Sequence, residues 1–282
     1  MKRQRHVLGL LLGVLLFTFF GAAHVQADLK RLSLGAGLGV VPEYEGSDDY
    51  EVVPVPFADV VWNSGRSVEL RGLKLKANLI PSDWKFGREV WRLGPMANYR
   101  FGRDGVDDDK VDRLKNVDDS FELGAFVGVG LDNWNFKVEA LQDVTNGHEG
   151  FLLTLRGGYR YPINPSWIVS LGAFTTYADG SYMNSYFSID NSDAARSGLK
   201  TFDADSGIKD VGFDVGASYT FAENWSVRAL GRYTRLVGDA ADSPVTDDRG
   251  SENQFLAGAV IVYTFGEAEP RPTEIDVEPY NY

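Results

Sequence analysis

Cysteine is absent from the 282-residue chain, which excludes a disulfide framework and any metal site built on cysteine. Histidine is scarce as well, since His148 is the single histidine after residue 27. Residues 28–282 also lack any apolar run close to the roughly eighteen residues that a transmembrane helix needs. If this part of the chain spans a membrane, it must do so as a closed barrel, because lipid cannot satisfy the edges of an open sheet.

Basic residues are outnumbered by acidic ones. The chain has 28 basic and 40 acidic residues, a formal charge of −12. Three of the basic residues and none of the acidic ones lie within residues 1–27, so the remainder has 25 basic residues against 40 acidic ones, a charge of −15. Nucleic-acid binding requires clustered lysine and arginine. This balance argues against nucleic acid as a partner.

The first 27 residues have the pattern of a secretory signal peptide. Three basic residues precede an apolar core over 7–20, and small residues ending at Ala27 form a cleavage site. The alternative is a membrane anchor, but the apolar run is short for a span and ends in a cleavable site. We therefore predict that residues 1–27 are removed.

The most regular stretch runs from Gly150 to Tyr177 and alternates with a period of two on both sides of a turn at 162–166. Each arm is about ten residues long, the length with which a tilted strand crosses a bilayer. Tyr161 and Trp167 bracket the turn, as expected for an aromatic belt at a membrane interface. The opposite face carries arginine, threonine and glycine, which favours a wet lumen over a dry core.

Similar alternation recurs along the chain and predicts an all-β protein, a closed antiparallel transmembrane barrel. The segments with this pattern are 32–41, 50–62, 68–79, 93–101, 121–131, 134–143, 150–161, 167–177, 211–221, 225–236 and 254–265. These are eleven, whereas termini that share the periplasmic side require an even number. At Arg71 and Gly72 the apolar residues change from even to odd positions, which indicates a bulge or a break between two short strands. We predict twelve strands, with ten as the alternative.

The connections between these segments alternate in length through the second half of the chain. Short turns at 132–133, 162–166 and 222–224 alternate with longer connections, among them 178–209, which leaves room for a short helix over 193–198. Outer-membrane barrels have short periplasmic turns and longer extracellular loops. We therefore predict an outer-membrane barrel over residues 28–265 in a Gram-negative bacterium, with outer-membrane lipid around it. Residues 266–282 are predicted to form a polar periplasmic tail.

The charged residues on the polar face of the predicted strands are the candidate lumen lining. Seven are basic and three are acidic: Arg92, Arg100, Lys137, Arg156, Arg160, Arg228, Arg232, Glu122, Glu139 and Asp214. The pattern leaves two interpretations open. These side chains either fill a narrow barrel as a salt-bridged plug or line an anion-selective channel, and a barrel of twelve strands is near the size at which either is possible.

No catalytic or cofactor constellation can be assembled from the sequence. A Ser-His-acid hydrolase needs a serine beside its histidine, and none lies near His148 along the chain. Asp203 and Asp205 have ligand-type spacing for calcium but do not fit the EF-hand pattern, so a solvated acidic loop is the simpler interpretation. We therefore expect no enzyme activity, no cofactor and no resident metal.

Several stretches resemble the MipA/OmpV family of outer-membrane proteins, which is named for the MltA-interacting protein. They cover residues 39–50 (GVVPEYEGSDDY), 94–104 (GPMANYRFGRD), 117–128 (VDDSFELGAFVG), 140–150 (ALQDVTNGHEG) and 181–187 (SYMNSYF). The resemblance implies an outer-membrane barrel with no catalytic residues to carry over. For the namesake member it implies a scaffold that brings together a murein hydrolase, which is a lytic transglycosylase, and a murein synthase. The segment 266–282 departs from the family, whose members usually end near the position of Phe265.

The sequence therefore predicts a non-catalytic scaffold that links the outer membrane to murein-remodelling enzymes. The alternative is a small pore or transporter that prefers anions. A third hypothesis, an enzyme acting on lipid, depends on His148 alone.

Overall fold

The computed structural model describes residues 28–266, in which nearly all regular structure is β-strand. The first strands are β1 (Leu29–Pro42), β2 (Tyr50–Trp62), β3 (Ser67–Arg71), β4 (Lys74–Asn78), β5 (Lys85–Phe86) and β6 (Glu89–Arg100). They are followed by β7 (Ser120–Leu131), β8 (Trp134–Asp143), β9 (Phe151–Asn164), β10 (Trp167–Ala178), β11 (Gly207–Ala222), β12 (Trp225–Leu236) and β13 (Asn253–Gly266). The predicted signal peptide (1–27) and most of the predicted tail (266–282) lie outside the described residues.

These strands close into an antiparallel barrel of twelve, because β13 pairs with β1 and β4 pairs with β6. The two-residue strand β5 forms an additional hairpin on the end of β6. The predicted change of face at Arg71 and Gly72 is a break, with β3 and β4 on either side of a turn in which Gly72 has a φ of +60°. This conformation favours glycine. Twelve strands are thus confirmed, and the alternative of ten is wrong.

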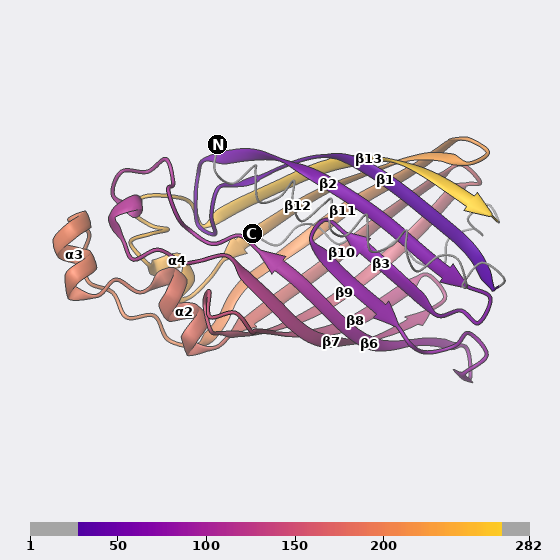
Figure 1. Ribbon diagram of the computed structural model, residues 1–282, viewed down its shortest axis with the longest axis horizontal. Coiled ribbons are helices and arrows are strands. Elements are labelled where there is room, and N and C mark those ends of the chain that lie inside the picture. The colour runs from indigo at the N-terminus through magenta and orange to yellow at the C-terminus, as the bar shows by residue number, and fades with distance from the viewer. Residues whose placement is uncertain (1–27, 267–282) are drawn as a thin grey trace.

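The two ends of the barrel differ, as Figure 1 shows: short turns lie at one end and long loops at the other. The described termini, in β1 and β13, lie at the end with the short turns. Outer-membrane barrels place their termini and short turns in the periplasm. The long loops therefore face the outside of the cell.

Side chains alternate between lipid and lumen along each strand. On β10, for example, Leu171 is 56% exposed and its neighbour Ser170 only 6%. The apolar residues that share the face of Leu171 contact hydrocarbon, which removes the cost of leaving them in water. The predicted wet inner face needs correction, because its polar residues are buried and apolar side chains such as Phe57, Phe174 and Val262 lie among them.

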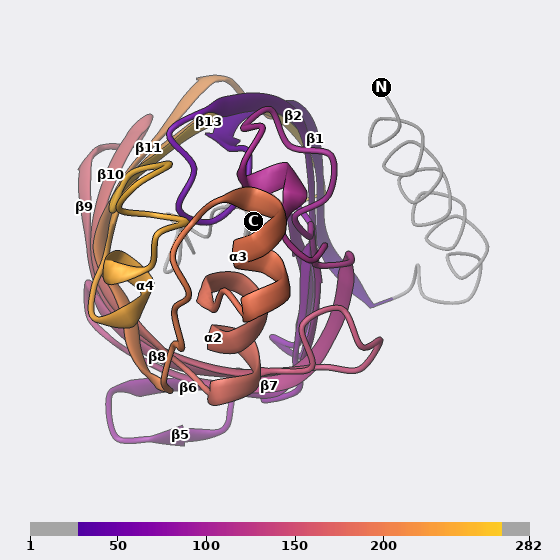
Figure 2. The ribbon, with the colours of Figure 1, turned by 90° about the vertical axis from the view of Figure 1, so that its left-hand side faces the viewer.

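The long loops fold over and into the outer end of the barrel, as the view along the axis shows (Figure 2). They contain η1 (Val111–Arg113), α2 (Gly180–Phe187), α3 (Asn191–Ser197) and α4 (Asp239–Asp242). The predicted helix over 193–198 corresponds to α3, whereas α2 was not predicted. The acidic loop 102–120 also buries Val111, Leu114 and Val117. Among residues 28–266, no helix is long and apolar enough to span a membrane.

Candidate functional site

One cluster of charges on the inner face has Glu139 of β8 at its centre. Its carboxylate lies 3.1 Å from Lys74 Nζ, 3.3 Å from Lys137 Nζ and 3.7 Å from Lys76 Nζ. Lys76 also lies 3.0 Å from Glu69. The three lysines and both glutamates are buried. Because β4 and β8 are separated by β6 and β7 in the sheet, these ion pairs join parts of the wall that are not neighbours.

A second cluster joins β9, β11 and β12. Asp214 accepts hydrogen bonds from Arg156 and from Arg232, the latter with an Nε to Oδ1 distance of 2.5 Å. Both guanidinium groups also lie over the ring of Phe174, at 4.7 Å and 4.3 Å from its centre. This arrangement places each arginine between a carboxylate and an aromatic face, which stabilises a desolvated cation.

A third cluster surrounds Glu122 of β7, which is fully buried. Its carboxylate accepts from Arg100 Nε at 2.7 Å and from Asn98 Nδ2 at 2.7 Å, and it lies 2.9 Å from His148 Nε2. The other ring nitrogen of His148 accepts from the backbone N–H of Gly150 at 3.0 Å. Both nitrogens of His148 are therefore engaged in holding the loop to the barrel wall.

Helix α2 closes the outer end of the lumen above these clusters. Tyr182 is completely buried, and its hydroxyl donates to Glu45 Oε2 at 2.5 Å. Lys209 forms ion pairs with Glu45 and Asp210. Burial raises the pKa of the Glu45 carboxyl, but the charges of Lys209 and Arg100 more than offset this and bring the pKa below its ordinary value.

Glycine at position 150 allows α2 to approach the wall this closely. A Cβ atom at Gly150 would lie 2.5 Å from the backbone nitrogen of Tyr182. The helix itself begins at Asp179, whose side chain accepts from Tyr182 N–H as an N-terminal cap.

The structure thus places the predicted lumen residues on the inner face but divides them among separate clusters. Arg160 and Arg228 are buried there too, with Arg228 over the ring of Phe57 at 4.6 Å, whereas Arg92 is half-exposed. The sequence reasoning missed several charged residues of the same network: Arg31, Glu45, Asp59, Glu69, Arg71, Lys74, Lys76, Lys209 and Asp210. If residues 68–79 had been assigned to two strands, the alternation within each strand would have placed Glu69, Arg71, Lys74 and Lys76 on the inner face.

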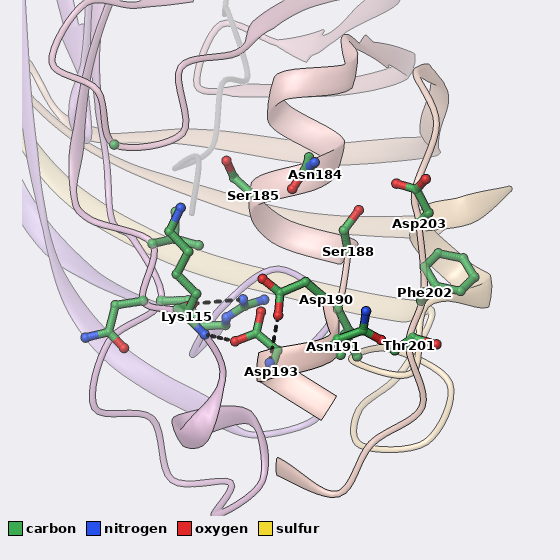
Figure 3. Close-up of a pocket in the computed structure, with 15 residues that line it drawn as sticks. Lys115, Asn184, Ser185, Ser188, Asp190, Asn191, Asp193, Thr201, Phe202 and Asp203 are labelled. Atoms are coloured by element: carbon green, nitrogen blue, oxygen red, sulfur yellow. Dashed lines mark hydrogen bonds between the residues drawn. The ribbon is translucent and has the colours of Figure 1, made fainter. Parts of the chain in front are cut away.

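One space between the clusters is small. A cavity between Arg100, Glu139, Arg156, Lys209 and Arg232 has a volume of about 60 Å³, which is room for a few water molecules. A larger pocket, of about 560 Å³, lies outside the lumen between the loop 101–119 and the segment 184–203 (Figure 3).

Comparison with known proteins identifies the family to which the chain belongs. The family model described as "MltA-interacting protein MipA" matches residues 34–265, which include β2 to β12 in full and most of β1 and β13. The chain belongs to the MipA family. The resemblance found in the sequence is thereby confirmed.

The relatives of this chain include proteins that are named as outer membrane proteins. The MltA-interacting protein of Escherichia coli (strain K12) is 28% identical over 243 residues, which cover 84% of this chain and 92% of the relative. The outer membrane protein OmpV of Vibrio cholerae is 26% identical and covers 69% of this chain and 75% of the relative. Among solved structures, the NanC porin covers 82% of this chain and 98% of its own, with 11% identity and a TM-score of 0.44.

The MipA-family chain is therefore an outer-membrane barrel of a Gram-negative bacterium. Residues 28–266 contain no group of three or more His, Cys, Asp or Glu side chains that could hold a metal ion. His148 is 1% exposed and is hydrogen-bonded to Glu122 and Gly150. In this setting the histidine orders a loop.

Proposed function

We propose that this protein is a closed, non-catalytic anchor in the outer membrane whose periplasmic face binds murein-remodelling enzymes, a murein hydrolase and a murein synthase. The observation that carries the proposal is the packing of the inner face in residues 28–266, where Glu122, Glu139 and Asp214 each form ion pairs with basic side chains of the barrel. A closed barrel of this kind acts by anchoring its periplasmic face to the outer membrane. The name of the Escherichia coli relative supports an MltA-type lytic transglycosylase as the hydrolase.

The charge arrangement fits a plug better than a channel. Glu139 and Asp214 each hold two or more cations from different strands, which fixes these side chains in position. Conduction requires binding that is weak enough for an ion to leave again. A solute that passed between these groups would first have to break buried ion pairs, which is costly in a desolvated site.

The periplasmic face has one prominent feature, the hairpin around β5. This hairpin projects sideways from the end of the barrel with the short turns (Figure 2). Trp84 is 48% exposed there, and Arg88 forms an exposed ion pair of 2.7 Å with Asp132 of the neighbouring turn. Exposed aromatic and arginine residues are the types that dominate binding energy at protein interfaces. We propose this hairpin as the docking surface.

The test is the binding of a purified MltA-type lytic transglycosylase to the protein in nanodiscs, followed by surface plasmon resonance. Trp84→Ala is expected to weaken binding by about tenfold or more, as for an interface anchor. Trp167→Ala is the matched control, since Trp167 is also exposed (40%) at a short turn. Removal of residues 267–282 tests the contribution of the tail separately. Absence of binding by the unaltered protein refutes the scaffold, and equal loss in both tryptophan variants refutes the hairpin as its site.

An anion-preferring pore is the second candidate, favoured by the excess of basic groups on the inner wall. Planar-bilayer recording distinguishes the two functions. We expect no steady conductance from the unaltered protein. A steady conductance whose ion preference reverses in Arg156→Glu with Arg160→Glu would establish the pore instead.

A further inference from the structure

The pocket outside the lumen contains a buried cation with no carboxylate in direct contact among residues 28–266. Arg103 is 3% exposed, and its backbone is fixed by a bridge to Val117, with N···O distances of 2.8 Å and 3.0 Å. Its guanidinium donates to the carbonyl oxygens of Tyr186, at 2.6 Å, and Lys115, at 3.4 Å. Within residues 28–266, its Nε has no acceptor and no carboxylate oxygen lies within 4.0 Å of the group.

A buried arginine of this kind is unusual, because a desolvated charge is costly unless an opposite charge compensates it. The charges elsewhere in the barrel follow that rule: Arg100, Arg156 and Arg232 each have a carboxylate partner. Burial lowers the pKa of Arg103, with Tyr186, Tyr44 and, without direct contact, Asp193 acting in the opposite direction. Arginine nevertheless stays protonated in proteins, so the site keeps its positive charge.

Two of the acidic side chains around the pocket, Asp190 and Asp193, have other partners, and a third lies across the pocket. Asp190 caps α3 by accepting from the backbone N–H groups of Ser192 and Asp193. Asp193 accepts from the backbone N–H of Lys115 at 2.8 Å and forms an ion pair with Arg196. Asp203 lies on the wall opposite Lys115 (Figure 3).

A second cation faces the same space. The exposed side chain of Lys115 points into the pocket toward Ser185 and Asn184 of α2, as Figure 3 shows. No ion pair of Lys115 is found in the described chain. Hydroxyl and amide groups from Asn184, Ser185 and Ser188 line the rest of this wall. The volume of about 560 Å³ falls within the range of roughly 300–1,000 Å³ that is typical of small-molecule sites.

We propose that this outward-facing pocket binds a small hydroxyl-bearing molecule through one oxyanion group, a carboxylate or phosphate, which pairs with Arg103 and Lys115. Arginine recognises both groups through parallel hydrogen bonds, and the neighbouring serine and asparagine side chains bind hydroxyls. Sugar acids and sugar phosphates have this chemistry. They occur as free solutes and as parts of the lipopolysaccharide around the barrel.

Isothermal titration of the detergent-folded full chain tests the site with glucuronate and glucose 6-phosphate as probes and glucose as the neutral control. We expect millimolar or tighter binding of at least one acidic probe and at least tenfold weaker binding of glucose. Arg103→Gln should weaken binding of the acid by about 10- to 100-fold, the effect of a charge-assisted hydrogen-bonded pair. Lys115→Gln should weaken it by about threefold.

Lys110→Gln is the matched control, because Lys110 is an exposed lysine of the same loop that does not line the pocket. Because Arg103→Gln could alter loop folding, Lys115→Gln at an exposed position is the independent variant. Lipopolysaccharide added as a competitor separates the two sources: displacement of the probe assigns the site to the lipid, and no displacement assigns it to a free solute. Equal binding of glucose, no binding of either acid, or unchanged affinity in both variants overturns the proposal.

Discussion

Replacing Glu139 by glutamine tests whether the barrel depends on its internal ion pairs. The substitution keeps the shape of the side chain and removes the negative charge shared by Lys74, Lys76 and Lys137, at 3.1, 3.7 and 3.3 Å. Loss of one partner of a buried ion pair costs about 3–5 kcal/mol, since the remaining charge stays desolvated. Lys76 keeps Glu69 at 3.0 Å, which argues for the lower end of this range, about 3 kcal/mol.

The measurement is the free energy of unfolding in urea, followed by tryptophan fluorescence of the protein folded in detergent micelles. Asp132→Asn is the control, because it removes one carboxylate from an exposed pair with Arg88 and should cost less than about 1 kcal/mol. In the Glu139→Gln protein, Lys74→Met should restore about 1–2 kcal/mol by removing a cation left without a partner. A cost for Glu139→Gln no greater than that of the control would refute the reasoning.

Three further predictions concern the loops. His148→Ala should lower the free energy of unfolding by about 2 kcal/mol, because it removes one hydrogen bond to the buried Glu122 and the ring that fills the site, without changing lipid turnover by outer-membrane vesicles; a change in turnover would revive the enzyme hypothesis. Because the pKa of Glu45 is lowered on folding, its stabilisation is present above the ordinary value of 4.5 and is lost as pH falls below it. The hydrogen-exchange protection factors of α2, in which the intrinsic pH dependence of amide exchange is removed, should therefore fall below that pH, and Glu45→Gln should abolish this fall; an unchanged profile contradicts this. Gly150→Val should displace α2, seen as faster proteolysis of 179–206, whereas Gly180→Val, where a Cβ meets nothing within 4 Å, should not.

The barrel could be predicted from the sequence because its wall obeys a local rule. Lipid on one side and the lumen on the other force a period of two, which a single strand such as 167–177 already displays. The twelfth strand also followed from local evidence, the change of face at Arg71 and Gly72. Two strands of five residues joined by so tight a turn left too short a pattern in either one to be counted alone.

The interior could not be predicted in the same way, because it depends on which side chains meet across the barrel. Parity places Glu139 and Lys137 on the inner face, but it cannot show that Lys74 approaches from a strand that is not a neighbour. Helix α2 was missed although its buried residues, Tyr182, Met183, Tyr186 and Phe187, have helical spacing. A helix of eight residues inside a long loop repeats that pattern over about two turns only. The role of Arg103 depends on the absence of a carboxylate in direct contact within the described chain, which only three-dimensional placement reveals.

The short hairpin of β3 and β4 has a consequence for how the cylinder comes apart. Where the chain's two ends meet, β1 and β13 share ten register pairs, whereas β4 and β6 share three. Under mechanical load or during insertion, the wall should therefore part between β4 and β6 rather than between β1 and β13. The segment that spans this junction is the β5 hairpin, so a protein seated on it would also clamp the weakest seam of the cylinder.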